Sequence, residues 1–194
     1  MDLVLHKITG SDTELYYYNN NSQVLFATDA AGDLKERNIF GNYIDEAVYT
    51  MAGYYIHDHL YSVVAITNDQ GAVQERIEYD AYGLPTFYSA NFANSYPVSQ
   101  LSNENPYLFT GRRVDILDGG SLKLQYNRNR YYSYTIGRWL THDPLGITPN
   151  PQSPNYFTPI AQYTDGLNVY EYVKSRPVDS RDAYGLACRT GDWM

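Results

Sequence analysis

The sequence predicts a mainly β protein made of serial antiparallel hairpins, and three features carry that prediction. Tyrosine exceeds the other aromatic residues, with 22 Tyr against 6 Phe and 2 Trp in 194 residues. Tyrosine suits half-buried sheet positions, where its ring packs and its hydroxyl meets water. Short apolar or alternating runs are divided by Asn, Asp and Gly, without long helical periodicity. The hydrophobic fraction of 43% is sufficient for a packed core.

The first hairpins occupy the N-terminal region. Residues 15–18 and 24–27 are short strand-like runs. The turn signals 19–22 and 29–33 follow them, and their Asn, Asp and Gly residues tolerate positive φ angles. These runs therefore predict strand, turn and strand in succession.

The next hairpin has the clearest pattern. Residues 62–67 form an apolar, β-branched run, residues 68–71 form a turn, and residues 73–79 alternate. This alternation places Glu75 on the same face as Ile77, which is the face expected to be buried. A single hairpin is marginally stable in water, so we expect neighbouring hairpins to stack on each other.

The second half of the chain is more irregular. Residues 89–106 are polar and contain prolines, which predicts a loop or linker. Strands are expected at 107–110 and 122–132. The proline-rich segment 147–163 argues against regular structure, and residues 167–173 are expected to form a short helix.

Composition excludes several classes of function. A net charge of −8 opposes binding to a nucleic-acid backbone. Cys188 is the single cysteine, so an internal disulfide is excluded, and no metal or cofactor site is predicted. The chain carries no export signal and no membrane span. His57-Asp58-His59 has metal-ligand residue types, but a hydrogen-bonding role in the sheet is the simpler interpretation. Four arginines are interpreted as cross-strand partners of surplus carboxylates: Arg112, Arg113, Arg128 and Arg130.

An ordered series of motifs resembles a known family. The stretches 54–64 and Glu78-Tyr-Asp-Ala-Tyr-Gly83 resemble the last repeats of Rhs/YD-repeat proteins. Further motifs resemble the Rhs repeat-associated core domain: residues 105–112, Leu124-Gln-Tyr126, Arg130-Tyr-Tyr132, Gly137-Arg-Trp-Leu140, Asp143-Pro-Leu-Gly146, residues 166–173 and Asp182-Ala-Tyr-Gly-Leu186. The resemblance divides the chain into terminal repeats (1–88), a linker (89–106), the core domain (107–186) and the start of a variable C-terminal region (187–194).

This resemblance implies a β-ribbon shell that encloses a C-terminal toxin or effector, with the core domain plugging one end. The implied partners are that cargo and the remaining shell, in a larger secreted or cell-surface bacterial protein. The family also resembles an aspartyl protease that detaches its own cargo. Transferred by motif, the cut lies between Leu186 and Ala187, and the candidate residues are Asp143, Asp182 and Arg138, with Asp165 a weaker one.

Two observations favour a non-catalytic interpretation. The letters of 182–186 also occur at 80–84, within the repeats, where a turn suffices. Ala183 stands where the family usually has proline. Because desolvation raises the pKa of a carboxyl group, and the shell is expected to provide it, the isolated chain is expected to stay uncut. A non-catalytic module that binds carbohydrate or a cell surface remains the alternative.

Overall fold

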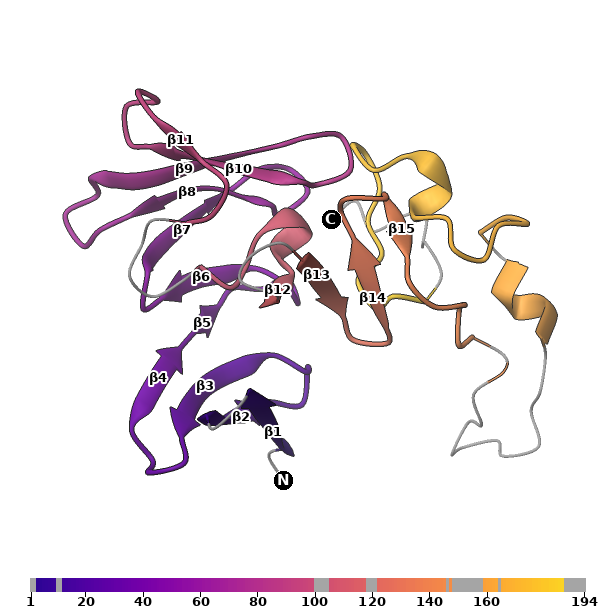
Figure 1. Cartoon of the computed structure of the whole chain (residues 1–194), viewed down its shortest axis with the longest axis horizontal. Coiled ribbons are helices and arrows are strands. Elements are labelled where there is room, and N and C mark those ends of the chain that lie inside the picture. Colours follow the sequence, from indigo (N-terminus) through magenta and orange to yellow (C-terminus); the bar gives the residue numbers. More distant parts are fainter. Residues whose placement is uncertain are drawn as a thin grey trace. The chain divides into compact units, whose positions relative to one another are not determined.

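The computed structural model describes residues 3–9, 12–99, 105–117, 122–145, 147, 159–163 and 165–186. It divides into two compact units, described separately below: unit 1 comprises Met1–Glu78 and Phe87–Asn105, and unit 2 comprises Tyr79–Thr86 and Pro106–Met194. The prediction of a mainly β chain of antiparallel hairpins is confirmed, with three sheets and, among the described residues, only short 3-10 helices (Figure 1).

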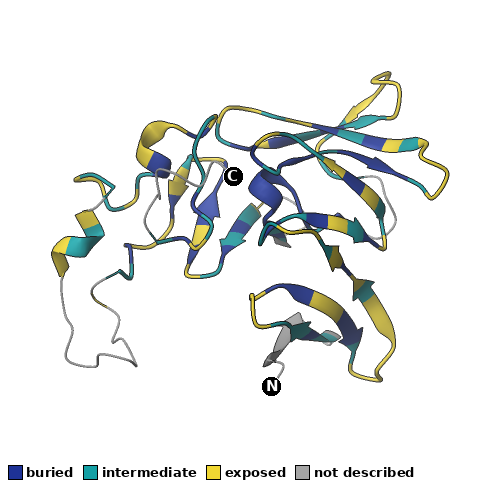
Figure 2. Ribbon diagram, turned by 180° about the vertical axis from the view of Figure 1, so that it is seen from behind, coloured by how far each residue is buried: buried dark blue, intermediate teal, exposed yellow. Residues whose placement is uncertain are grey.

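The first sheet of unit 1 has four antiparallel strands in chain order. They are β1 (Leu3–Thr9), β2 (Asp12–Tyr18), β3 (Val24–Asp29) and β4 (Leu34–Arg37). Tyr16, Val24 and Ala27 are buried together. On the neighbouring positions Tyr17 and Phe26 stack with ring centroids 4.3 Å apart. Figure 2 shows bands of buried and exposed residues along β3. Burial does not alternate strictly along this strand, because a bulge interrupts its pairing with β4.

The second sheet has seven strands in the order β11-β10-β9-β8-β7-β6-β5. Their bounds are β5 Ile39–Phe40, β6 Ala47–Thr50, β7 Gly53–His57, β8 Val63–Thr67, β9 Val73–Tyr79, β10 Pro85–Ser89 and β11 Ser95–Tyr96. The strand predicted at 73–79 is correct to the residue, and Glu75 is buried beside Ile77. Ser99 Oγ donates a hydrogen bond of 2.8 Å to Glu75. The segment 89–106, which was predicted to be a loop, contains the two-residue strand β11, and this strand pairs with β10.

The third sheet, in unit 2, contains β12 (Arg113–Leu117), β13 (Leu122–Asn127), β14 (Arg130–Ser133) and β15 (Arg138–Trp139) in chain order. The single strand expected at 122–132 is wrong, because a tight turn at residues 128–129 separates β13 from β14. Arg128 adopts a φ of 60° in this turn. This turn reverses the chain and brings Arg130 opposite Asn127.

Two other predicted elements are also wrong. The expected strand 107–110 is replaced by a single bridge at Tyr107 and the 3-10 turn Phe109–Gly111. The expected helix 167–173 is not formed, and the chain instead makes the 3-10 turn Val173–Ser175, with Lys174 at a φ of 56°. Most of the proline-rich segment lies outside the described residues, apart from residue 147 and the 3-10 turn Pro159–Tyr163.

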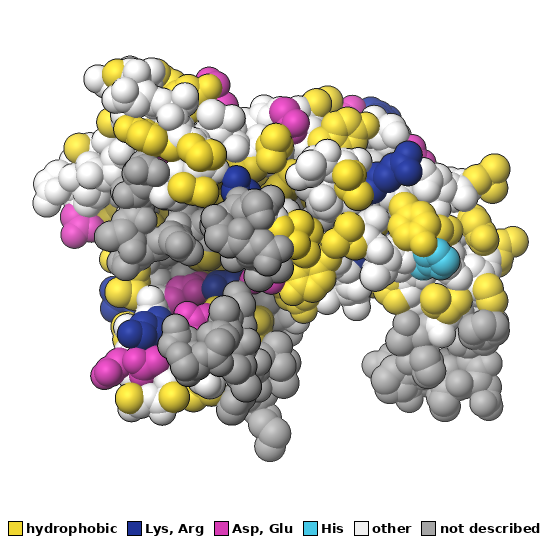
Figure 3. Space-filling model, viewed as in Figure 1, with side chains coloured by type: hydrophobic (Ala, Val, Ile, Leu, Met, Phe, Trp, Pro, Cys, Tyr) yellow, Lys and Arg dark blue, Asp and Glu magenta, His cyan; other side chains and the backbone are white. Residues whose placement is uncertain are grey.

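Aromatic rings form the centre of unit 2. Tyr132 and Tyr172 are fully buried, with ring centroids 4.3 Å apart, and Trp139 lies edge-on to Tyr172 at 5.3 Å. The Tyr132 hydroxyl donates a hydrogen bond of 2.8 Å to the carbonyl of Tyr82, which belongs to the short N-terminal segment of this unit. Burial raises the pKa of Tyr132. On the face shown in Figure 3, hydrophobic side chains reach the surface in separate patches among polar groups. No helix in the described ranges is long and apolar enough to cross a membrane.

Candidate functional site

The C-terminal turn of unit 2 is organised by Asp182. Its Oδ1 atom accepts hydrogen bonds from the backbone N–H groups of Tyr184 (3.2 Å) and Leu186 (3.1 Å). Gly185 has a φ of 63° in this turn. The same turn, with one side-chain oxygen bound to the amides two and four residues later, begins at Asn19, Asp29, Asp58, Asn68 and Asp80. The turn that the sequence predicted for the repeated pentapeptide Asp-Ala-Tyr-Gly-Leu is therefore confirmed at residues 80–84 and at residues 182–186.

Side chains near the β13–β14 turn hold this terminal turn in place. Arg112 and Arg128 both donate to the carbonyl of Ala183, the latter through Nη1 at 2.6 Å. Asn127 Nδ2 donates to the carbonyl of Asp182 at 3.1 Å. Arg112 and Arg128, interpreted from the sequence as partners of carboxylates, thus bind backbone oxygen here.

Two buried carboxylates meet one guanidinium at the same place. Asp143 and Asp182 are each only 4% exposed. The Nη2 atom of Arg130 lies 3.2 Å from Oδ2 of Asp143 and 3.2 Å from Oδ2 of Asp182. The other oxygen of Asp143 accepts a hydrogen bond of 2.8 Å from the N–H of Leu145. Each aspartate therefore uses one oxygen to shape its own turn and directs the other to Arg130.

Arg130 is itself 4% exposed, and its guanidinium carbon lies 4.1 Å from the centroid of the Trp139 ring. Such stacking suits the planar guanidinium. Burial lowers the pKa of Arg130, and the charges of Asp143 and Asp182 oppose that effect. One cation faces two carboxylates, so the site is electrically neutral when the pair holds one proton.

The environment of Asp143 raises its affinity for a proton. Burial raises the pKa of its carboxyl group above the ordinary value of 3.8, and the charges of Asp182 and Asp165 add to this effect. The Leu145 N–H and Arg130 oppose it. A carboxyl group with a raised pKa is suited to hold and donate a proton near neutral pH.

The residue before the predicted cut is bound directly in this site. Arg130 Nη2 donates a hydrogen bond of 2.5 Å to the carbonyl oxygen of Leu186, and Nε donates one of 2.7 Å to the carbonyl of Gly185. The N–H of Leu186 is held by Asp182. Both polar groups of the Leu186 backbone are thus fixed beside the two carboxylates, whereas Ala187 lies outside the described residues.

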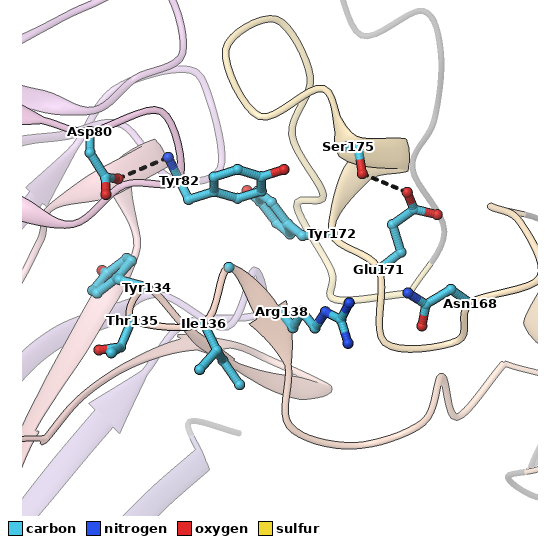
Figure 4. A pocket seen from close by; sticks show the side chains of 11 residues that line it. Asp80, Tyr82, Tyr134, Thr135, Ile136, Arg138, Asn168, Glu171, Tyr172 and Ser175 are labelled. Atoms are coloured by element: carbon cyan, nitrogen blue, oxygen red, sulfur yellow. Dashed lines mark hydrogen bonds between the residues drawn. The ribbon is translucent and has the colours of Figure 1, made fainter.

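The other two predicted site residues lie elsewhere. Arg138 is exposed, and its neighbour Trp139 is buried, because consecutive residues of β15 point to opposite faces. Arg138 lines a cavity of about 400 Å³, in which Figure 4 shows its guanidinium extending toward Asn168. Asp165 is paired with Lys174, whose Nζ lies 3.6 Å away, and the charge of Asp165 raises the pKa of Asp143. The structure therefore brings together Asp143, Asp182 and Leu186, but not Arg138.

Arg130 is the residue that sequence reasoning missed at this site. It stands in the Arg130-Tyr-Tyr132 motif, which resembles the core domain, and a turn at 128–129 would have placed it at a strand end beside its partners. The expectation that only a surrounding shell desolvates the carboxylates is also wrong, since residues of this chain bury them. Among the residues that the structure describes, no group of three or more His, Cys, Asp or Glu is placed to hold a metal ion.

The chain matches no family model. It is 29% identical over 183 residues to the tRNA3(Ser)-specific nuclease WapA of Bacillus spizizenii, covering 92% of this chain and 7% of that protein. It is 28% identical over 122 residues to the double-stranded DNA deaminase toxin A of Burkholderia cenocepacia, covering 63% of this chain and 7% of the toxin. The chain thus spans only a small part of the length of these relatives.

The fold is shared with a solved structure. Crystalline TcdB2-TccC3 matches 96% of this chain with a TM-score of 0.56 and 18% sequence identity, over 8% of its own length. The same fold is found in TcdB2-TccC3-Cdc42, with a TM-score of 0.55. Together with one relative named as a nuclease and one named as a toxin, this fold is consistent with the Rhs-related family that the sequence motifs resemble.

Proposed function

We propose that this chain is the end-plug of an Rhs-type shell and that it cuts its own backbone after Leu186, releasing whatever follows as cargo. The single observation that carries the proposal is that two buried carboxylates and the Leu186 carbonyl all meet at one nitrogen of Arg130. A structural turn needs only one oxygen of Asp182. It does not need a second buried carboxylate from residue 143.

The chemistry follows from the unequal environments of the two aspartates. Asp143, whose pKa is raised by burial, carries the shared proton. Asp182, held by two backbone N–H groups and Arg130, acts as the base that takes a proton from a water molecule. The water oxygen adds to the Leu186 carbonyl carbon, and the bond to the Ala187 nitrogen then breaks. Such paired acid and base groups are a common solution for hydrolysis near neutral pH.

The names of two relatives support the delivery part of this proposal. They are named as a nuclease and a deaminase toxin, activities that belong to those proteins. In the proposed role, this chain matches the delivery part of such proteins, and the variable region from residue 187 onward begins the cargo. Its partners are therefore that cargo and the rest of the shell.

Intact-mass spectrometry of the 194-residue chain tests the proposal. The sequence alone led us to expect an uncut chain, but residues of this chain already bury both carboxylates. We therefore now expect slow loss of residues 187–194 from the wild type, and no loss from Asp143→Asn or Asp182→Asn. Asp80→Asn is the matched control, because Asp80 begins the same five letters and the same turn but is exposed. Cleavage that persists in Asp143→Asn, or a wild-type chain that stays whole between about pH 4 and about pH 8, would remove the protease role.

The carbohydrate-binding alternative has less support. Stacking on a sugar requires an exposed aromatic face. In the cavity beside Arg138, the rings of Tyr134 and Tyr172 are buried at 2% and 0% exposure and offer no such face. Exposed tyrosines do lie on the sheets, among them Tyr54 at 45% and Tyr131 at 37% exposure, so the strand surface is where sugar binding would occur. A glycan array on which the chain shows saturable binding would reverse this preference.

A further inference from the structure

The cavity of about 400 Å³ beside Arg138 lies within unit 2 and is separate from the candidate cleavage site. Its walls are formed by residues 80–82, by residues 134–138 and by residues 168–175. Neither of the two buried aspartates nor Arg130 lines it. A volume of this size is typical of sites for small molecules, in which a few polar groups select the ligand. The charged and polar side chains on the walls therefore indicate what fits.

The guanidinium of Arg138 lines this cavity without a protein partner. The backbone of Arg138 pairs with that of Glu171 in an antiparallel bridge. Residues paired in this way carry their side chains on the same face, where opposite charges attract each other. Across the described part of the chain, however, the Arg138 side chain makes no ion pair or hydrogen bond, with Glu171 or with any other residue. An exposed planar guanidinium of this kind is suited to bind a carboxylate.

Asn168 supplies a second donor beside Arg138. Its Oδ1 atom accepts a hydrogen bond of 3.2 Å from the backbone N–H of Tyr170, which identifies the other end of the amide as the nitrogen. Figure 4 shows that nitrogen turned toward the guanidinium. Tyr134 also lines the cavity, and its buried hydroxyl has no hydrogen-bond partner among the residues that the structure describes. Donors without acceptors gather here, so an oxygen-rich anion such as a carboxylate fits among them.

Two carboxylates on the walls call for positive charge in the same ligand. Asp80 and Glu171 both line the cavity, and each uses one oxygen within the protein (Figure 4). Asp80 Oδ1 accepts a hydrogen bond of 2.9 Å from the N–H of Tyr82, and Glu171 Oε1 accepts one of 2.6 Å from Ser175 Oγ. Against these two carboxylates stands one arginine, which leaves the lining with a net negative charge. A simple anion is therefore repelled, whereas a ligand that also carries cationic groups is attracted.

An unusual turn holds the Glu171 carboxylate in position. Val173, Lys174 and Ser175 have φ angles of 42°, 56° and 57°, three successive left-handed residues of which none is glycine. Such a conformation is uncommon, above all for a β-branched valine, and strained backbone of this kind is concentrated at functional sites. Here the turn brings the Ser175 hydroxyl onto Glu171. The carboxylate is thus oriented before any ligand arrives.

We propose that this cavity binds a basic α-amino acid, whose carboxylate is held by Arg138 and Asn168 and whose positive charge faces Glu171. Lysine and arginine carry one carboxylate and two cationic groups, so their net positive charge balances the negative lining. Acidic amino acids and inorganic phosphate add negative charge and are disfavoured. The inference does not depend on the proposed cleavage, because the cavity contains none of the residues assigned to that reaction.

Isothermal titration calorimetry of the full 194-residue chain with L-lysine is the first test. We expect saturable binding at one site per chain. L-lysine methyl ester lacks the carboxylate, and L-norleucine lacks the side-chain ammonium, so each should bind at least about 10-fold more weakly, the usual effect of losing one charged hydrogen bond. No saturation by about 10 mM L-lysine would overturn the inference. Equal binding of the methyl ester would also overturn it, and equal binding of norleucine would overturn the assignment to a basic amino acid.

Variants of the charged wall residues form the second test. Arg138→Gln should bind L-lysine about 10- to 100-fold more weakly, and Glu171→Gln about 10-fold, although its amide oxygen still accepts from Ser175. Arg37→Gln is the matched control, since Arg37 is an exposed arginine of unit 1 and its loss changes the net charge by the same amount. This control should bind like the wild type. Wild-type affinity in a folded Arg138→Gln chain, as judged by circular dichroism, would contradict the proposal.

Asn168→Asp tests the site without any change at the two charged residues. The aspartate keeps an oxygen for the N–H of Tyr170, so the local turn is retained. It replaces the donor beside Arg138 by a negatively charged acceptor, and binding of L-lysine should fall below detection. An Asn168→Asp chain that binds L-lysine as tightly as the wild type would show that the carboxylate is not held between these two side chains.

Discussion

Asp182 and Asp80 begin identical five-residue stretches, yet only one lies in the candidate site. Both close the same turn with one carboxylate oxygen. Their difference is burial, since Asp80 is exposed and Asp182 is covered by residues 127–130. The local sequence predicts the turn. The second carboxylate oxygen of Asp182, however, binds Arg130, which lies more than 50 residues away along the chain. Sequence motifs named Asp143 and Asp182 as candidates, but they pointed to Arg138 and not to Arg130 as the accompanying arginine.

The raised pKa of Asp143 makes a prediction about stability and pH. Because folding raises this pKa above 3.8, the folded chain holds the proton more tightly than the unfolded chain. The resulting stabilisation is complete below the unfolded value and is lost as the pH rises through the folded one. Asp143→Asn lacks this loss, so its free energy of unfolding should gain on that of the wild type between about pH 4 and about pH 8.

Urea unfolding of both chains at several pH values measures this difference, on samples shown to be uncut by intact mass. A difference that stays constant across the range would show that burial does not perturb Asp143.

The positions of the turns determine which side chains meet in the candidate site. The sequence predicted some of these turns and missed one. The Asn and Asp turns at 19, 29, 68 and 80 follow from local chemistry, and the structure has them. The turn at 128–129 was missed because the alternation on either side of it continues without a Gly or Pro. That one turn exchanges a long strand for a hairpin and brings Arg130 to Asp182.

Gly185→Ala should disturb the site through its backbone. A Cβ atom at Gly185 would lie 2.5 Å from the carbonyl oxygen of Asn127, and the φ of 63° is itself unfavourable for alanine. We expect about 2 to 4 kcal/mol of lost stability, from left-handed strain and a clash that cannot relax, together with slower cleavage.

Gly71→Ala is the control for that substitution. Gly71 occupies the same place in an equivalent turn, with a φ of 78°, and a Cβ there would meet nothing within 4 Å. It should lose only about 1 kcal/mol, since it has the strain without the clash. Equal losses in the two variants, measured by urea unfolding, would contradict the contact between the terminal turn and Asn127.

At the scale of the whole molecule, unit 2 is discontinuous in sequence. It takes in Tyr79–Thr86, which precede the rest of the unit by about 20 residues. The carbonyl of Tyr82 accepts the hydroxyl of the fully buried Tyr132, and Gly83 packs so closely on Phe109 that a side chain would overlap its ring. The excess of tyrosine predicted sheets with shared rings, but it could not show which distant segment completes which core.

A fragment of residues 106–194 should therefore fail to fold, because it lacks residues 79–86. The expected result is loss of the near-ultraviolet circular dichroism of its buried tyrosines and tryptophan. A chain lacking only residues 1–37, which removes the first sheet and leaves residues 79–86 in place, serves as the control and should keep that signal. A native spectrum from the fragment would show that the short segment is dispensable.

The hold on Leu186 has a kinetic consequence under the proposed chemistry. Catalyst and substrate are one molecule, so no encounter is required, and the progress of the reaction is independent of how dilute the protein is. After scission, the new carboxylate at Leu186 would sit as an anion against Arg130, where it occupies the place that another peptide would need. Each copy then acts a single time, and its cleavage site stays bound to the new C-terminus at Leu186.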